Sequence, residues 1–111
     1  MRTVTPKPFP TNLELRSSKQ LGEAVRAART QTGLTLADAA MTLGVAKQTL
    51  SDLELGKPSV GLGLALEIAA GLGVALFMVP ASAREQTRMR LMNLVEVSIN
   101  HDTFKPLPTS P

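Results

Sequence analysis

Apolar residues recur at the spacing of short helices in the central part of the chain, residues 17–56. Ser17-x-x-Gln20 fits a capping box at the start of the first helix, and Gly33 is a left-handed stop at its end. Between these two signals the apolar positions follow a helical period. They are Leu21, Val25 and Ala28.

A second and a third helix follow, separated by a very short turn. Thr35 can cap the second helix, and Asp38 lies near its positive end. This helix ends at Gly44, which accepts positive φ at low steric cost, and the third helix runs from about Ala46 to Gly56. Two short helices joined by a tight glycine turn are typical of the helix-turn-helix motif. Small and apolar residues favour a close crossing: Ala39, Ala40, Leu43, Val45, Leu50 and Leu53.

The stretch from Val60 to Pro80, VGLGLALEIAAGLGVALFMVP, is apolar except for Glu67. A membrane span of about 20 residues would carry this charge and two Gly-x-Gly steps through lipid, so we do not expect one. A break at residues 71–73 divides the stretch into a fourth helix and a strand. The helix is apolar on nearly all sides, which predicts burial between its neighbours. Its expected face comprises Leu62, Leu66 and Ala69.

The strand is expected at residues 74–79, where every position is apolar. This pattern suits a short strand that is covered on both faces. We therefore expect the strand to pair with the same strand of a second copy of the chain. The residues predicted to make this dimer contact are Val74, Leu76, Phe77, Met78 and Val79.

The two flanks have different patterns. Prolines at positions 6, 8 and 10 exclude a helix and predict an extended, mobile arm over residues 1–16. Residues 81–100 contain an amphipathic helix at 84–99, which we expect to pack on its own domain or on a dimer mate. A surface for a separate partner is the alternative. Its apolar stripe is Met89, Met92, Val95 and Ile99. Residues 101–111 form a Pro-rich tail, and the helical domain before residue 81 is expected to span 17–80.

Composition narrows the fold class and the location. The chain has 111 residues, enough for one modest domain, and its 3% aromatic content favours packed helices over a sheet sandwich. There is no cysteine, and the first residues lack the apolar segment of a signal peptide, so we expect a cytoplasmic protein. We predict an all-α bundle of four to five helices with a short C-terminal dimerisation strand.

Charge is distributed unevenly along the chain. The net charge is +3, but residues 20–73 carry −1 and residues 1–19 carry +3. A basic balance can indicate nucleic acid as a partner, yet the central domain is not basic. Affinity for DNA would therefore depend on a few placed residues and on the arm.

The run LGVAKQTLSDLELGK, followed by LALEIAAGLGV, resembles the helix-turn-helix domain of the Xre family, relatives of lambda-type repressors. The resemblance covers Leu21 to Val74. The link GKPSV and the segment ALFMVP are most similar to HipB-type antitoxins, in which such a strand pairs two subunits. The chain departs from the family at Leu36, where many members have a phosphate-binding Gln, and at Ala46, where many have a capping Ser. Two glycines, Gly61 and Gly63, should also weaken the first turn of the fourth helix.

The third helix would present polar residues to the major groove of DNA. Near its N-terminal end, Lys47 can donate to guanine and Gln48 can pair with adenine. Asp52 either accepts from cytosine or excludes other bases. A solvated face is the simpler interpretation of such residues. The predicted DNA contacts are Lys47, Gln48, Thr49, Ser51, Asp52, Lys57, Thr35 and Lys19.

One acidic residue of the third helix has a different expected role. Glu54 stands where the family commonly has a Glu before the loop, which indicates a structural residue. We expect it to pair with a basic group such as Arg26 or Arg29, with simple exposure as the alternative.

Enzymatic interpretations find little support. His101 is the only histidine and lies beside Asp102 in a polar tail, with no second ligand group nearby. Gly61-x-Gly63 lacks the third glycine, the preceding strand and the following Lys-Ser/Thr of nucleotide-binding loops. We expect no catalytic residue, no metal site and no cofactor.

The leading hypothesis is a homodimeric repressor that binds an inverted repeat in double-stranded DNA. The HipB resemblance implies a HipA-like serine/threonine kinase toxin as a partner, and repression of the operon that encodes both proteins. Two alternatives remain open. One is a free-standing or phage-type Xre regulator without a toxin, and the other is an interaction adaptor that keeps the fold without binding DNA.

Overall fold

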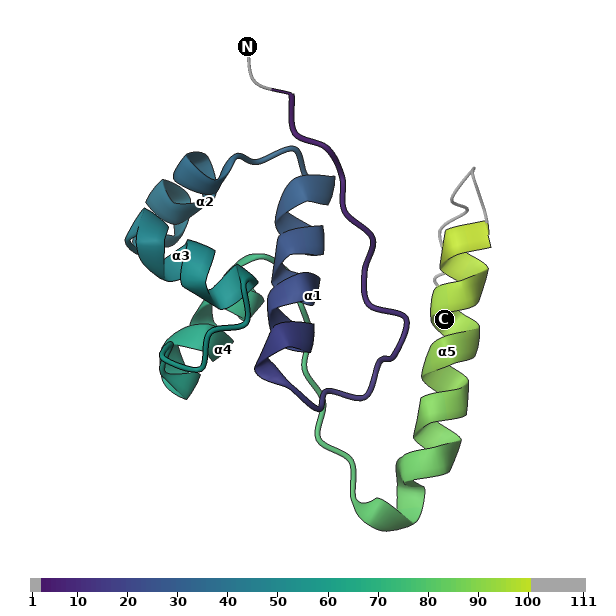
Figure 1. Ribbon diagram of the computed structural model, residues 1–111. Coiled ribbons are helices and arrows are strands. Elements are labelled where there is room, and N and C mark those ends of the chain that lie inside the picture. Colours follow the sequence, from purple (N-terminus) through teal and green to yellow (C-terminus); the bar gives the residue numbers. More distant parts are fainter. Residues whose placement is uncertain (1–2, 101–111) are drawn as a thin grey trace, which may run out of the picture. The chain divides into compact units, whose positions relative to one another are not determined.

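The computed structural model describes residues 3–100, with side chains for residues 3–95. The chain divides into two compact units, Met1–Leu76 and Phe77–Pro111, and each is described by itself. The first unit contains α1 (Ser18–Gln31), α2 (Leu36–Leu43), α3 (Lys47–Glu54) and α4 (Leu62–Gly71) (Figure 1). The second contains a short 3-10 helix, η1 (Ala81–Ala83), and α5 (Arg84–Asn100). The all-helical prediction is confirmed for the described residues.

The first two helices begin where their capping residues predict. Ser17 Oγ accepts a hydrogen bond from the Gln20 N–H at 3.1 Å, and Thr35 Oγ1 accepts one from the Asp38 N–H at 3.1 Å. The Gln20 side chain does not complete a capping box, because its amide bonds the preceding arm instead. Helix α3 has no side-chain cap at Ala46.

The turn between α2 and α3 depends on Gly44, whose φ is 71°. Its N–H donates to the Met41 carbonyl at 3.2 Å, and the Val45 N–H donates to the Ala40 carbonyl at 3.0 Å. These bonds satisfy carbonyl groups at the end of α2, and the positive φ favours glycine. The turn thereby connects the two helices in very few residues.

The core of the first unit lies where the four helices meet. Its largest fully buried side chains are Val25 of α1, Leu50 of α3 and Ile68 of α4. Helix α1 crosses α3 closely at Gly22, where an added Cβ would lie 2.4 Å from the Leu53 carbonyl oxygen. The crossing therefore requires glycine at this position. The other core members are Leu21, Ala24, Ala39, Ala40, Leu53, Ala65, Ala69 and Val74.

A buried ion pair joins α1 to α3. Arg29 Nε donates to Glu54 Oε2 at 2.5 Å, and Arg29 Nη2 donates to Glu54 Oε1 at 2.8 Å. Both side chains are more than nine-tenths buried. The remaining terminal nitrogen, Nη1, donates to the Leu34 carbonyl at 2.8 Å. The prediction that Glu54 pairs with a basic residue of α1 is confirmed, and Arg29 is its partner.

Helix α4 is less buried than its sequence predicts. Ala65, Ile68 and Ala69 face the core, as the burial pattern shows. Leu62 and Leu66, which we expected on one face with Ala69, are 72% and 45% exposed. The prediction of all-round burial is therefore wrong for the single chain, because only one side of α4 has neighbours. An apolar strip of α4 remains exposed.

Residues 74–80 form neither helix nor strand. Val74 is buried and its N–H donates to the Ala69 carbonyl at 2.8 Å. Phe77 and Met78 are 74% and 98% exposed. The predicted strand is not formed among the described residues, since a strand needs a neighbouring strand for its hydrogen bonds. Pairing with a second copy stays a prediction.

The N-terminal arm lies along α1 rather than extending freely (Figure 1). The Lys7 N–H donates to Thr30 Oγ1 at 2.9 Å, and the Lys7 carbonyl accepts from Gln31 Nε2 at 2.9 Å. Both partners belong to the last turn of α1. The arm is extended as predicted, but its described part is docked and not free.

A single glutamine bonds the other end of the arm. Gln20 Nε2 donates to the carbonyls of Asn12 and Glu14 at 2.6 and 2.7 Å, and Gln20 Oε1 accepts from the Arg16 N–H at 2.7 Å. Because prolines keep the arm extended, its backbone groups cannot pair as they would in a helix. Helix α1 supplies partners for several of them.

In the second unit, α5 begins at Arg84, and its weak separation of apolar and polar sides departs from the amphipathic pattern that we expected. Met89 and Met92 of the expected stripe are 57% and 43% exposed. The Ile99 side chain, His101 and the predicted tail at 101–111 lie outside the described residues. None of the described helices combines the length and apolarity needed to cross a bilayer.

The ion pair generates a stability prediction. We expect Arg29→Ala to lower the free energy of unfolding by about 3–5 kcal/mol, because Glu54 would be left buried with an unpaired charge. Urea denaturation measures the loss. The matched control is Arg26→Ala, an exposed arginine of the same helix, with an expected change within about 0.5 kcal/mol. Equal losses in the two variants would contradict the prediction.

Candidate nucleic-acid interface

The two sides of α3 have different environments. Leu50 and Leu53 are buried, whereas Lys47 and Gln48 are exposed at the N-terminal end of the helix. Three further predicted contacts are half-buried: Thr49, Ser51 and Asp52. The core therefore fixes one side of the helix while its first polar side chains remain accessible. A helix in the major groove uses residues near its N-terminus for base contacts.

Three of the predicted site residues contact one another. Gln48 Nε2 donates a hydrogen bond to Asp52 Oδ1 at 2.8 Å. Lys57 Nζ lies 3.2 Å from the same oxygen. We call this set, Gln48, Asp52 and Lys57, the polar triad. Asp52 therefore contacts two of the side chains that were assigned to DNA.

The triad changes the titration of its acid. The hydrogen bond from Gln48, followed by that from Lys57, lowers the pKa of Asp52 below its ordinary 3.8. The carboxylate is therefore ionised at neutral pH, and an ionised carboxylate only accepts hydrogen bonds.

The loop after α3 packs against the start of α1. Ser18 Oγ donates to the Gly56 carbonyl at 2.8 Å. Gly56 has a φ of 76°, and a Cβ there would lie 2.5 Å from Lys19 Cα. This close approach brings the exposed Lys19 next to the loop that carries Lys57. Two of the predicted phosphate-contacting cations thus lie on neighbouring segments.

Thr35 has a structural role in addition to its predicted contact. Its Oγ1 accepts from the Asp38 N–H as the cap of α2. The hydroxyl hydrogen is still a donor, and the positive end of a helix favours a phosphate. A phosphate contact by Thr35 is compatible with the cap.

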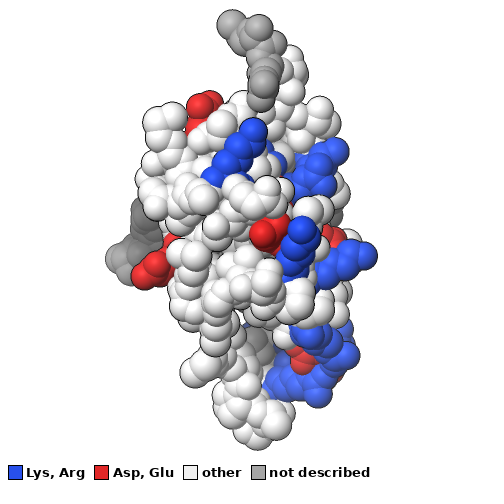
Figure 2. All heavy atoms as spheres, turned by 60° about the vertical axis from the view of Figure 1, so that its left-hand side comes forward, with Lys and Arg blue, Asp and Glu red and all other residues white. Residues whose placement is uncertain are grey.

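The charged surface is mixed rather than uniformly basic. In Figure 2, Lys and Arg side chains occur with Asp and Glu among them, and most of the surface shown is uncharged. This distribution agrees with the −1 charge of residues 20–73. Any affinity for DNA would depend on individual contacts more than on a broad positive field.

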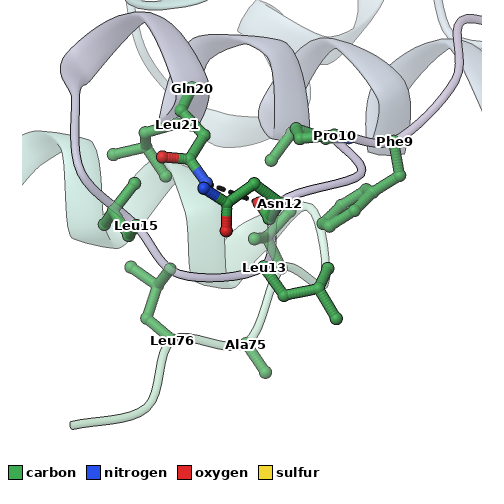
Figure 3. A pocket seen from close by; sticks show the side chains of 11 residues that line it. Phe9, Pro10, Asn12, Leu13, Leu15, Gln20, Leu21, Ala75 and Leu76 are labelled. Atoms are coloured by element: carbon green, nitrogen blue, oxygen red, sulfur yellow. Dashed lines mark hydrogen bonds between the residues drawn. The ribbon is translucent and has the colours of Figure 1, made fainter. Parts of the chain in front are cut away.

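A small apolar pocket lies between the arm, α1 and residues 74–76 (Figure 3). Its lining includes Phe9, Leu13, Leu21 and Leu76. The volume is about 60 Å³. This is far below the ~300–1,000 Å³ of small-molecule sites. The pocket is better explained as space left where the arm packs on the domain.

Sequence analysis missed two features of this region. The first is the bridging role of Asp52, although Gln48 and Asp52 are four residues apart and so lie on one face of a helix. The second is the docked arm, whose only sequence signal is the polar Gln20 at the start of α1. Neither signal is specific, because exposed Gln and Asp residues are common on helices.

The triad predicts a change in titration. Gln48→Ala removes a hydrogen bond to the Asp52 carboxylate and should raise its pKa toward 3.8. Since the folded pKa is lowered, the stability that the triad contributes is present at neutral pH and is lost as pH falls through the folded pKa. NMR titration of side-chain carboxylates measures the shift. An unchanged Asp52 titration in Gln48→Ala would contradict the prediction.

Comparison with known proteins supports the motif. A family of helix-turn-helix domains matches residues 25–77. No curated protein gives a significant match to the chain.

Solved structures are similar to part of the chain. HipB in complex with the O4 20-mer is 25% identical, with a TM-score of 0.55, over 61% of this chain and 96% of that chain. A HipB point variant in complex with the O2 20-mer is 26% identical, with a TM-score of 0.55, over 61% and 94%. A structure named MDT protein is 25% identical, with a TM-score of 0.55, over 61% and 96%. Residues 25–77 therefore match the helix-turn-helix family, and the chain is similar to HipB.

Proposed function

We propose that the chain is a sequence-specific DNA-binding repressor that acts as a homodimer on an inverted repeat. The observation that carries the proposal is the exposed N-terminal end of α3 on a fixed scaffold. Lys47 and Gln48 are accessible there, while Leu50 anchors the same helix in the core. Lys and Gln provide the hydrogen-bond groups that guanine and adenine present in the major groove. The similarity to HipB, solved in complex with 20-mers, supports this use.

Contacts to phosphate would orient the domain on the duplex. Lys19 and Lys57 are exposed on adjacent segments beside α3, and Thr35 caps the start of α2. Thr49 is half-buried on α3. Such contacts position a protein without specifying sequence. Base contacts by Lys47 and Gln48 would then provide the specificity.

Dimerisation follows from the small number of base contacts. One helix-turn-helix offers few of them, and two half-sites about one helical turn apart supply the missing affinity. Residues 75–79 provide exposed apolar surface for a second copy, whereas Val74 is buried in the first unit. Phe77 and Met78 are each more than 70% exposed. Burial of such residues in a dimer would be favourable.

The similarity to HipB also supports a role as an antitoxin. In this proposal the dimer neutralises a HipA-like serine/threonine kinase and represses the operon that encodes both proteins. Co-purification with the product of a neighbouring kinase gene would support it. A lone gene beside phage functions would indicate an Xre regulator without a toxin.

One observation favours a second candidate function, an interaction adaptor that does not bind DNA. Asp52 places a negative charge between Gln48 and Lys57, where a phosphate backbone would be repelled. The net charge of −1 on residues 20–73 also favours the adaptor. DNA binding depends on the exposed residues of α3, whereas the adaptor function does not.

Replacing both base-contacting residues distinguishes the two functions. We expect Lys47→Ala combined with Gln48→Ala to weaken binding to the protein's own upstream DNA at least ~30-fold, since each contact contributes about 1 kcal/mol or more. Fluorescence anisotropy at fixed salt, with a scrambled duplex for comparison, measures the loss. The matched control is Arg90→Ala with Gln86→Ala, which removes one cation and one amide from exposed positions of α5. Unchanged affinity in the α3 variant would favour the adaptor.

Self-association has its own test. Phe77→Asp should weaken the dimer at least ~10-fold, because a charge would be buried at the interface. Analytical ultracentrifugation measures the dissociation constant. Leu55→Asp is the control, since Leu55 is a 63% exposed leucine at the end of α3 and outside the proposed dimer contact at 74–79. A monomeric wild type, or equal effects of the two substitutions, would count against dimerisation through residues 74–79.

A further inference from the structure

The side chain of Gln48 is oriented by its neighbour on the same helix. Its Nε2 donates to Asp52 Oδ1 at 2.8 Å, across one turn of α3. Lys57 Nζ also lies 3.2 Å from the same oxygen. Asp52 therefore lies between a residue expected to contact a base and a residue expected to contact a phosphate.

The chemistry of the acid decides which atoms Gln48 presents outward. An ionised carboxylate only accepts, so Gln48 must turn its NH₂ group toward Asp52. A side-chain amide has two N–H donors and one carbonyl acceptor. One donor is used by Asp52, which leaves one donor and the carbonyl for a ligand.

The remaining donor and acceptor match the hydrogen-bond groups of adenine and not those of guanine. In the major groove adenine offers the N7 acceptor and the N6 donor, which require one donor and one acceptor from the protein. Guanine offers two acceptors, O6 and N7, which require two donors. With its amide group held by Asp52, Gln48 presents the one donor and one acceptor that adenine requires.

We propose that Asp52 is a positioning residue that sets the base preference of Gln48, favouring adenine over guanine. The inference rests on the proposed function and assigns Asp52 a role through Gln48 instead of a direct contact with cytosine. Lys57 contributes by fixing the carboxylate. Its other two N–H groups remain available for a phosphate.

Asp52→Asn tests the inference, because it keeps the size of the side chain but adds a donor. Gln48 could then turn its carbonyl toward the new amide and present two donors outward. Against duplexes that vary one base pair at a time, the wild type should prefer adenine over guanine about 5- to 150-fold at one position of each half-site. In Asp52→Asn this preference should fall to within about threefold, with similar affinity for the best site.

Two controls separate positioning from a general effect. Asp38→Asn makes the same change at an exposed position of α2 and should leave the preference unchanged. In a Gln48→Ala background, Asp52→Asn should have no further effect on the preference, since the two residues act as a pair. Circular dichroism and urea denaturation check that every variant is folded.

Each outcome decides between the inference and the function on which it rests. A wild type that prefers no duplex would overturn both. If the wild type is selective, an unchanged preference in Asp52→Asn, or an equal loss on all duplexes, would overturn the inference alone. NMR gives a readout without DNA: the Gln48 side-chain NH₂ resonances should differ between wild type and Asp52→Ala. Identical resonances would also overturn the inference alone.

Discussion

The buried ion pair between Arg29 and Glu54 determines how α3 is placed on the rest of the domain. One guanidinium bonds α3 through two carboxylate oxygens and bonds the segment before α2 through the Leu34 carbonyl. Burying two charges is costly, and their geometry must be good to offset the cost. Bidentate pairs have a strict geometry, whereas contacts among Ala and Leu side chains tolerate small shifts. The pair therefore specifies the orientation of the α3 face that carries Lys47 and Gln48.

Close backbone contacts act together with this ion pair. Gly22 admits the α3 carbonyls against α1, and Gly56 lies against Lys19 at the start of α1. The two glycines and the ion pair join α1 to α3 and to the loop that follows it. The exposed side of α3 is then organised by hydrogen bonds within the helix and from Lys57. A fixed interior and an ordered polar face are both needed for a selective base contact.

The helices and their starts were predictable because local signals determine them. Ser17, Thr35 and Gly44 act on their own neighbours, and their caps and turn formed as expected. Features that depend on residues far apart in the sequence were harder to predict. Hydropathy could not show that α4 is exposed on one side, and a proline-rich arm gives no sign that Gln20 bonds it. Site residues were predicted from the motif, but the bond from Gln48 to Asp52 depends on rotamers that a sequence does not specify.

The docked arm has a consequence for synthesis of the protein. The arm leaves the ribosome before the rest of this domain, yet the pocket that it closes is lined by Val74, Ala75 and Leu76 as well as by α1. Translation at about 5–20 residues per second separates Arg16 from Leu76 by roughly 3–12 s. During this interval the arm can form its hydrogen bonds with α1, but residues 74–76, which complete the pocket, have not yet been made. The arm is thus made before α1 but completes its packing only after residues 74–76 have been made.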